Sequence, residues 1–355
     1  MALLNTWASQ QDPNSLSPLD RALNTYIQQG NAPLSYLLRG DTQGLLKDLN
    51  TPRPVNITQD MMNTALNVNP VSGLLSKAIT QAPKYSSLLG KSDVEQSATN
   101  RLITQYPELK QQYSGLDLPH AETKGGRILN TDAARELFPE YQANRTLSAQ
   151  VHEPASTFVK NLYAEKLSQP TPQGLQNTVV FTAGGTGAGK TSAIRAASES
   201  AGDALNKAEM IYDTNMNTFK SADDKIQQAL KAGRDVQIFY TYRDPVESLT
   251  QGALSRASKM EKNFGSGRTV PLSEHLKTHI GSRKTIDELA SKYKDNPNVQ
   301  ISAIDNSKGV GKAERVELSN LPKLNKKEIR KKLNEALEQS KSSISEAIYR
   351  GTKDY

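Results

Sequence analysis

Residues 178–192, TVVFTAGGTGAGKTS, form the segment best suited to chemistry: an apolar stretch, a glycine-rich turn and the start of a helix. From Gly184 to Thr191 the segment fits G-x-x-x-x-G-K-[ST], the Walker A form of a phosphate-binding loop. Glycines at 184, 185, 187 and 189 allow positive φ and a bare backbone, so that successive N–H groups can face phosphate oxygens. The sequence therefore predicts a nucleoside triphosphate site.

Each position of this loop has a predicted role. The following helix adds its positive end, Lys190 supplies a point charge to the β- and γ-phosphates, and the Thr191 hydroxyl is placed to bind Mg²⁺. The expected nucleotide-binding residues are Gly184, Gly185, Thr186, Gly187, Ala188, Gly189, Lys190, Thr191 and Ser192.

A triphosphate site alone leaves three classes open: a motor or switch NTPase, a small-molecule kinase, and a scaffold that binds nucleotide without hydrolysis. A kinase needs an acidic residue beside the acceptor hydroxyl and cations over the transferring phosphoryl group. The cation candidates are Arg256, within a predicted helix at 245–264, and Arg268, in a glycine-flanked loop. This arrangement can close as a lid.

The elements that must position these residues alternate from about Lys124 onward, as in α/β units on a parallel sheet. Five strands and several helices are expected. The strands are 126–130, 178–183, 208–213, 235–241 and 299–304; the helices are 132–137, 155–167, 190–201, 221–232 and 245–264, two more within 273–293, and a Lys-rich helix from 325 to about 348. We expect a P-loop kinase-like parallel sheet flanked by helices.

The 355 residues are too many for one compact core. We expect a helical N-terminal module at 1–120, the α/β domain at 121–310 and a basic amphipathic helix at 311–355. Within this module, the sequence pattern predicts helices near 18–27, 58–66 and 92–113, the last interrupted near Pro107.

Composition excludes several classes. No apolar run approaches the roughly 20 residues that a bilayer helix needs, and the start of the chain has no secretory pattern. The sequence has no Cys, which excludes disulfides and thiolate sites and fits a cytoplasmic setting. A net charge of +7 from 44 Lys+Arg and 37 Asp+Glu would attract nucleic acid only if clustered. No membrane or nucleic-acid partner is expected.

Residues 128–141, ILNTDAARELFPEY, carry a resemblance to a known family. They resemble the segment of zeta-toxin P-loop kinases in which an Asp-x-Asp-type turn runs into a helix with a Pro-aromatic pair. The resemblance covers about 124–308. It implies that Asp132 is the general base and that Arg256 and Arg268 are the lid arginines.

Two departures from the family pattern stand out. The first acid of the turn is Asn130 here, which weakens a metal role at that position. The acid-bearing strand also precedes the P-loop strand, whereas in the usual zeta toxin it follows the P-loop helix. We therefore expect a permuted order, with Asp132, Lys190 and Asp213 meeting at the carboxyl edge of the sheet.

Asp213 keeps three interpretations: a carboxylate holding Mg²⁺ through water, a substrate contact, or the base itself. Asp132 is preferred as base because its context matches the family better. His152, in a segment that also resembles the family, could contact substrate or be structural.

The resemblance implies a kinase that transfers the γ-phosphate of ATP or GTP, with Mg²⁺, to a hydroxyl of a small molecule such as a UDP-activated amino sugar. It also implies association with phage or mobile-element proteins, in which the N-terminal module would dock to a partner and the protein would act in the bacterial host cytoplasm or with a virion. The alternative is a phage-type structural or docking protein whose P-loop domain binds nucleotide without significant catalysis.

Overall fold

The computed structural model describes residues 92–118, 121–197, 199–309 and 311–354. The chain divides into two compact units, residues 1–105 and 106–355. The described part of the first unit is helix α7 (Asp93–Thr104), whose Ser92 side chain caps the helix by accepting from the Glu95 N–H. The helices predicted near 18–27 and 58–66 lie outside the described residues.

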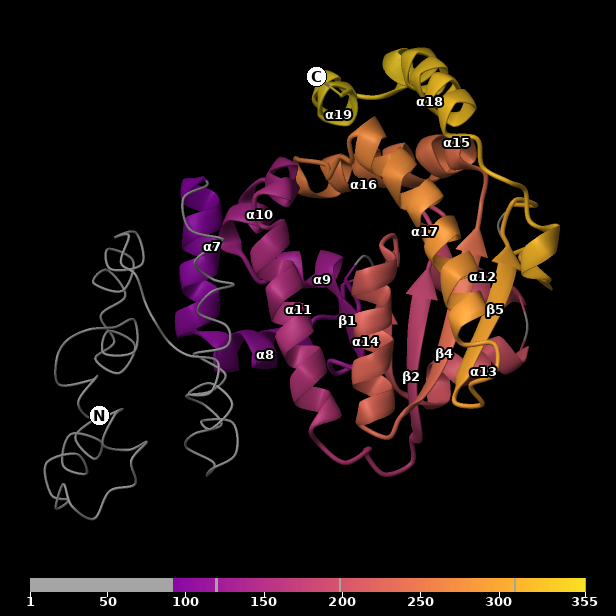
Figure 1. The fold of residues 1–355 in the computed structure, drawn as a ribbon. Coiled ribbons are helices and arrows are strands. Elements are labelled where there is room, and N and C mark those ends of the chain that lie inside the picture. The colour runs from indigo at the N-terminus through magenta and orange to yellow at the C-terminus, as the bar shows by residue number, and fades with distance from the viewer. Residues whose placement is uncertain (1–91, 119–120, 198, 310, 355) are drawn as a thin grey trace, which may run out of the picture. The chain divides into compact units, whose positions relative to one another are not determined.

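The described part of the second unit is built on a six-stranded sheet (Figure 1). In chain order the strands are β1 (Ile128–Asn130), β2 (Gln176–Ala183), β3 (Ala208–Asp213), β4 (Asp235–Tyr242), β5 (Val299–Asp305) and β6 (Glu314–Val316). In space they run β1-β3-β2-β4-β5-β6, all parallel except β6, which pairs antiparallel with β5. The predicted α/β class and the five predicted strands are confirmed, and β6 is an edge strand that the sequence did not suggest.

The strand order confirms the expected permutation. β1 precedes β2 in the chain but pairs with β3, so that Asn130 lies opposite Asp213, and Asp213 lies opposite Thr182 of β2. The ends of β1, β3 and β2 therefore meet at one edge of the sheet, where parallel sheets bind ligands.

Helices cover both faces of this sheet (Figure 1). The helices described in the second unit are α8 (Tyr106–Ser114), α9 (Thr131–Arg135), α10 (Pro139–Ala143), α11 (His152–Leu167), α12 (Lys190–Ala197), α13 (Glu199–Lys207), α14 (Phe219–Lys231), α15 (Pro245–Glu247), α16 (Ser255–Phe264), α17 (Leu272–Lys292), α18 (Lys326–Ser340) and α19 (Glu346–Thr352). Short 3₁₀ segments are η1 (Arg145–Ala149), η3 (Leu318–Asn320) and η4 (Lys341–Ser343), and η2 (Ser248–Leu254) is a π-helix.

Alternating strand residues build the two layers of the core. Val180 and Ile211 point toward α12 and α13, where Ile194 and Leu205 pack with them. Phe181, next to Val180 in β2, points the other way, toward Tyr163 of α11, with the ring centroids 6.2 Å apart. This continuous apolar pattern explains why β2 is buried on both faces.

Three helix predictions are wrong in their boundaries. Residues 272–292 form one helix, α17, rather than two, because its buried positions continue along the whole length from Leu272 to Leu289. The helix predicted at 190–201 is instead two, α12 and α13. The Lys-rich C-terminal helix ends at Ser340, and α19 starts only after Ser345, whose hydroxyl caps it by accepting from the Ile348 N–H.

The C-terminal helices pack on the same cluster as the π-helix. Leu333 and Leu337 of α18 and Ile348 of α19 are buried with Leu249 and Leu276. The predicted apolar stripe thus faces the protein, which leaves the lysines of α18 in solvent. No helix in the described part of the chain is long and apolar enough to span a membrane.

Candidate active site

The glycine-rich turn joins β2 to α12, as the sequence predicts. Gly184, Gly187 and Gly189 have positive φ angles of 137°, 78° and 74°. Gly185 does not; it is required for close packing, because a Cβ there would overlap the His279 ring of α17. Backbone freedom thus favours glycine at Gly184, Gly187 and Gly189, and lack of space requires it at Gly185 and also at Gly184 and Gly187.

Three side chains hold this loop from behind. The Thr186 N–H donates to Thr278 Oγ1 at 3.1 Å, and the Thr186 carbonyl lies 3.1 Å from His279 Nε2. Burial lowers the pKa of His279 to about 3, so the imidazole is neutral and its Nε2–H donates to the carbonyl. On the other side, Asn306 Nδ2 donates 2.8 Å to the Ala188 carbonyl.

Lys190 begins α12 and lies at the edge of the sheet. Its Nζ donates 2.9 Å to Asn215 Oδ1, two residues beyond the end of β3. The next residue, Thr191, is partly exposed, whereas the Ser192 hydroxyl donates 3.0 Å to the Gly189 carbonyl. The Ser192 hydroxyl therefore stabilises the loop through this hydrogen bond.

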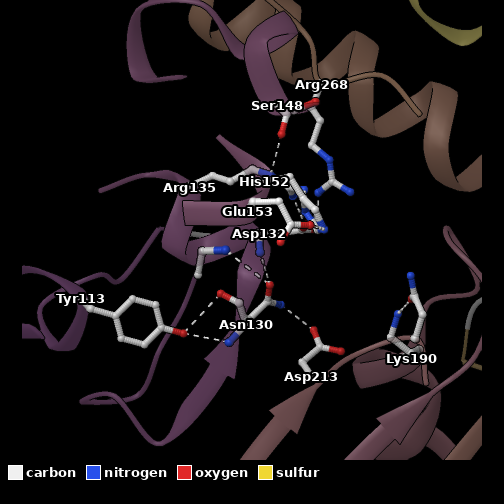
Figure 2. A network of polar contacts seen from close by, with 12 residues as sticks. Tyr113, Asn130, Asp132, Arg135, Ser148, His152, Glu153, Lys190, Asp213 and Arg268 are labelled. Atoms are coloured by element: carbon white, nitrogen blue, oxygen red, sulfur yellow. Dashed lines mark hydrogen bonds and ion pairs between the residues drawn. The ribbon is translucent and has the colours of Figure 1, made fainter. Parts of the chain in front are cut away.

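Asp213 ends β3 and is held from both neighbouring strands. Thr182 donates from Oγ1 to Asp213 Oδ1 at 2.5 Å, and Asn130 donates from Nδ2 to Asp213 Oδ2 at 2.6 Å. Figure 2 shows Asp213 between Asn130 and Lys190. Both carboxylate oxygens are thus oriented by the sheet, and each keeps a second lone pair for another ligand.

Asn130 links this carboxylate to the segment that carries Asp132. Its Oδ1 caps α9 by accepting from the backbone N–H groups of Asp132, at 2.6 Å, and Ala133, at 3.3 Å. The Tyr113 hydroxyl of α8 fixes the same strand end: it accepts from the Asn130 N–H at 2.8 Å (Figure 2). It also donates to the Ile128 carbonyl at 2.8 Å.

The Asp132 carboxylate lies among three arginines. It forms ion pairs with Arg135 of α9 and with Arg268 of the loop after α16. Burial alone would raise the pKa of Asp132, but the charges of Arg268, Arg135 and Arg256 together hold it well below its ordinary range. The carboxylate is therefore ionised at neutral pH, and its side chain remains 34% exposed.

Arg256 lies near the same charged groups, Asp132, Arg135 and Arg268. Among the described residues it forms no ion pair, and its buried Nε has no hydrogen-bond partner. The positive charge of Arg268 and burial lower the pKa of Arg256 to about 10, which leaves it protonated at neutral pH. Three guanidinium groups thus face one carboxylate.

His152, at the start of α11, contacts Arg135: its Nδ1 accepts from the Arg135 guanidinium at 2.7 Å, and Arg135 Nε also donates to the Ser148 carbonyl at 3.1 Å. Burial, and then the Arg135 charge, lower the pKa of His152. The imidazole therefore orients Arg135. The sequence analysis did not predict Arg135 as a site residue, and the only sequence signal for it was its i,i+3 spacing from Asp132 on a helix.

The residues present fit a nucleotide with Mg²⁺. The glycine-shaped loop, the Lys190 ammonium and the unpartnered Nε of Arg256 suit phosphate oxygens. The part of the chain that the structure describes contains no cluster of three or more His, Cys, Asp or Glu that could enclose a metal. Mg²⁺ beside a triphosphate does not need one, because phosphate oxygens, water and one or two protein oxygens complete its octahedron.

A parallel sheet with a glycine-rich loop between β2 and α12 defines a P-loop protein, and its site is of the kinase-like, nucleotide-binding class. Residues 203–310, less than half of the chain, match the family model described as Zeta toxin, and this match is consistent with a zeta-toxin-like P-loop kinase domain. The matched range includes Asp213, Arg256 and Arg268; Asp132 and the P-loop precede it. No curated protein matches the chain.

Proposed function

We propose that the protein is a phosphotransferase that moves the γ-phosphate of ATP or GTP to an alcohol group of a small molecule. The observation that carries the proposal is the meeting of Asp132, Arg268 and Asp213 with the Lys190 loop at one edge of the sheet, although Asp132 is encoded before the loop.

The nucleotide is held by the loop. The backbone from Gly184 to Gly189 surrounds the phosphates, and Lys190 binds the β- and γ-phosphate oxygens after exchanging its contact with Asn215. Magnesium, when bound, supplies positive charge to the phosphate oxygens. Thr191 would hold it directly, and Asp213, already oriented by Thr182 and Asn130, would hold it through water.

Asp132 is proposed as the acceptor's base. The acceptor hydroxyl would take the place of one arginine on the carboxylate and give its proton to Asp132, while the acceptor oxygen bonds to the γ-phosphorus. The bond from that phosphorus to the β–γ bridging oxygen breaks, and the nucleoside diphosphate leaves with the electron pair. When Arg268 moves from Asp132 to the phosphoryl group, the carboxylate loses a positive neighbour and becomes more basic.

Asp213 is the other base candidate. Both of its oxygens already accept short hydrogen bonds from the sheet, which supports a fixed role beside the metal over proton transfer. Arg256 and Arg268 would neutralise the charge that spreads over the transferring group.

The acceptor class is proposed from the family resemblance. A UDP-activated amino sugar carries both a hydroxyl and a diphosphate, and three arginines beside one carboxylate favour an anionic ligand. The division at 120 and 310, the docking role of the N-terminal module, the phage association and the cytoplasmic setting remain proposals of the same kind.

The test is incubation with γ-labelled ATP, Mg²⁺ and a bacterial metabolite extract. The parent protein should yield a labelled product that Lys190→Ala does not. Lys308→Ala, which removes an exposed ammonium paired with Glu314, is the matched control and should yield the parent's product. Nucleotide binding without product would contradict the kinase and support the scaffold alternative.

A further inference from the structure

A buried ion pair lies beside the site and takes no part in the proposed chemistry. Arg145, at the start of η1, places its Nη2 atom 3.0 Å from Glu136 Oε2, and the two side chains are only 5% and 2% exposed. Its Nη1 atom also donates to the Gln142 carbonyl at 3.0 Å. Glu136 follows α9, so the pair fixes η1 to the segment that carries Asp132.

The far end of η1 is tied to the same helix. Arg135 Nε of α9 donates 3.1 Å to the Ser148 carbonyl. The short 3₁₀ segment is therefore held at both ends by the end of α9, through Arg135 and through Glu136, the residue that follows the helix.

Arg145 also reaches the loop that carries Arg268. Its backbone N–H donates 2.9 Å to Ser266 Oγ, and its guanidinium carbon lies 4.0 Å from the centre of the Phe264 ring, a cation–π distance. Phe264 is 40% exposed, so its position over the arginine is not explained by burial of the ring. Ser266 stands two residues before Arg268.

The same loop packs closely against α16. A Cβ at Gly267 would overlap the Ala257 carbonyl oxygen, so the loop lies directly on the helix that carries Arg256. The loop that carries Arg268 therefore contacts Arg145 on one side and α16 on the other, and these contacts fix its position.

We propose that Arg145 is a positioning residue that sets the place of Arg268 relative to Asp132. It touches neither nucleotide nor acceptor; it joins the segment that carries the base to the loop that carries the arginine. The inference rests on the proposed kinase function. Loss of the contact would misplace one cation of the transition state while leaving the P-loop intact, so it would lower kcat and spare ATP binding.

The experiment alters the loop side of the contact, because breaking a buried ion pair at Arg145 itself could unfold the protein. Phe264→Leu keeps an apolar side chain but removes the aromatic face, and Ser266→Ala removes the acceptor. Phe264→Tyr keeps the aromatic face. Asn263→Ala, an exposed neighbour on α16, is the matched control.

The combined Phe264→Leu, Ser266→Ala variant should lose about 10-fold in kcat, with the KM for ATP within about twofold of the parent. Phe264→Tyr and Asn263→Ala should stay within about twofold in both constants. Parent kcat in the combined variant, or a loss that appears only in the KM for ATP, would overturn the inference.

Amide hydrogen exchange of residues 265–270, measured without nucleotide, separates this inference from the proposed function. If the parent makes no product, the kinase proposal fails, and exchange alone decides the contact. The combined variant should exchange these amides at least about threefold faster than the parent and Asn263→Ala. Unchanged exchange would show that Arg145 does not hold the loop.

Discussion

Asn130 and Asp213 face each other at the ends of neighbouring strands, with Asn130 Nδ2 2.6 Å from Asp213 Oδ2. The same amide caps α9 through its oxygen, at the residue that carries the predicted base. The Asn130 side chain therefore connects the Asp213 carboxylate to the backbone N–H of Asp132. An aspartate at position 130, as in the family pattern, would set two carboxylates against each other, which gives a physical reason for asparagine in this strand order.

Substitution of Asn130 should separate its two contacts. Asn130→Ala removes the cap of α9 and the donor to Asp213, and we expect the free energy of unfolding in urea to fall by about 1–2 kcal/mol. Asn130→Ser keeps a capping oxygen and should lose less than half as much. Equal losses in the two variants would contradict the capping role.

Gly185→Ala should destabilise the P-loop because the added Cβ overlaps the buried His279 ring. We expect a loss of about 1–3 kcal/mol in the free energy of unfolding and weaker ATP binding by calorimetry. Gly202→Ala, in α13 with no atom near the new Cβ, is the control and should not destabilise the protein. His279→Ala in the Gly185→Ala background should restore part of the ATP affinity by making room; no recovery would remove the steric explanation.

The buried histidines behind the loop predict acid sensitivity. Burial lowers the pKa of His275 to about 4 and that of His279 to about 3, below the ordinary value of about 6.5 in the unfolded chain. Between these values the unfolded state binds more protons, so stability falls as pH drops from about 6.5 toward 4.

His279→Gln, which keeps a donor for the Thr186 carbonyl, should reduce this slope by about 1 kcal/mol per pH unit between pH 6 and 4.5. Urea unfolding at several pH values measures it. A variant with the parent's pH slope would show that His279 does not remain neutral in the folded protein.

Arg256 should matter for catalysis more than for stability. Because it forms no ion pair among the described residues and its Nε has no partner, Arg256→Met should leave the melting temperature within a few degrees of the parent. Phosphate transfer should fall by about 10²–10³-fold, since one donor to the transferring group is lost. Arg330→Met, on the exposed side of α18, is the control; a parent-like rate in Arg256→Met would exclude Arg256 from the site.

The sequence predicted the sheet because its strands are short apolar runs bounded by turn residues, and the Walker A pattern located the loop. The position of Asp132 opposite the loop followed only from the family pattern, since nothing local indicates that β1 pairs with β3. Asn215 and Tyr113 could not be found this way, because their roles depend on contacts between elements distant in the chain, whereas the only local signal for Arg135 is its i,i+3 spacing from Asp132. The break between α18 and α19 was missed because apolar residues continue at helical spacing through Ile344 and Ile348.

The most direct test of the account is the rate of phosphate transfer by Asp132→Asn. Asparagine keeps the size of the side chain and cannot accept a proton, so with γ-labelled ATP and an extract that supports the parent, the rate should fall by at least about 10²-fold. ATP affinity should remain within about twofold, because Lys190 and the loop are untouched. Transfer at the parent's rate would contradict the assignment of Asp132 as base and the central claim that the permuted strand supplies the catalytic carboxylate.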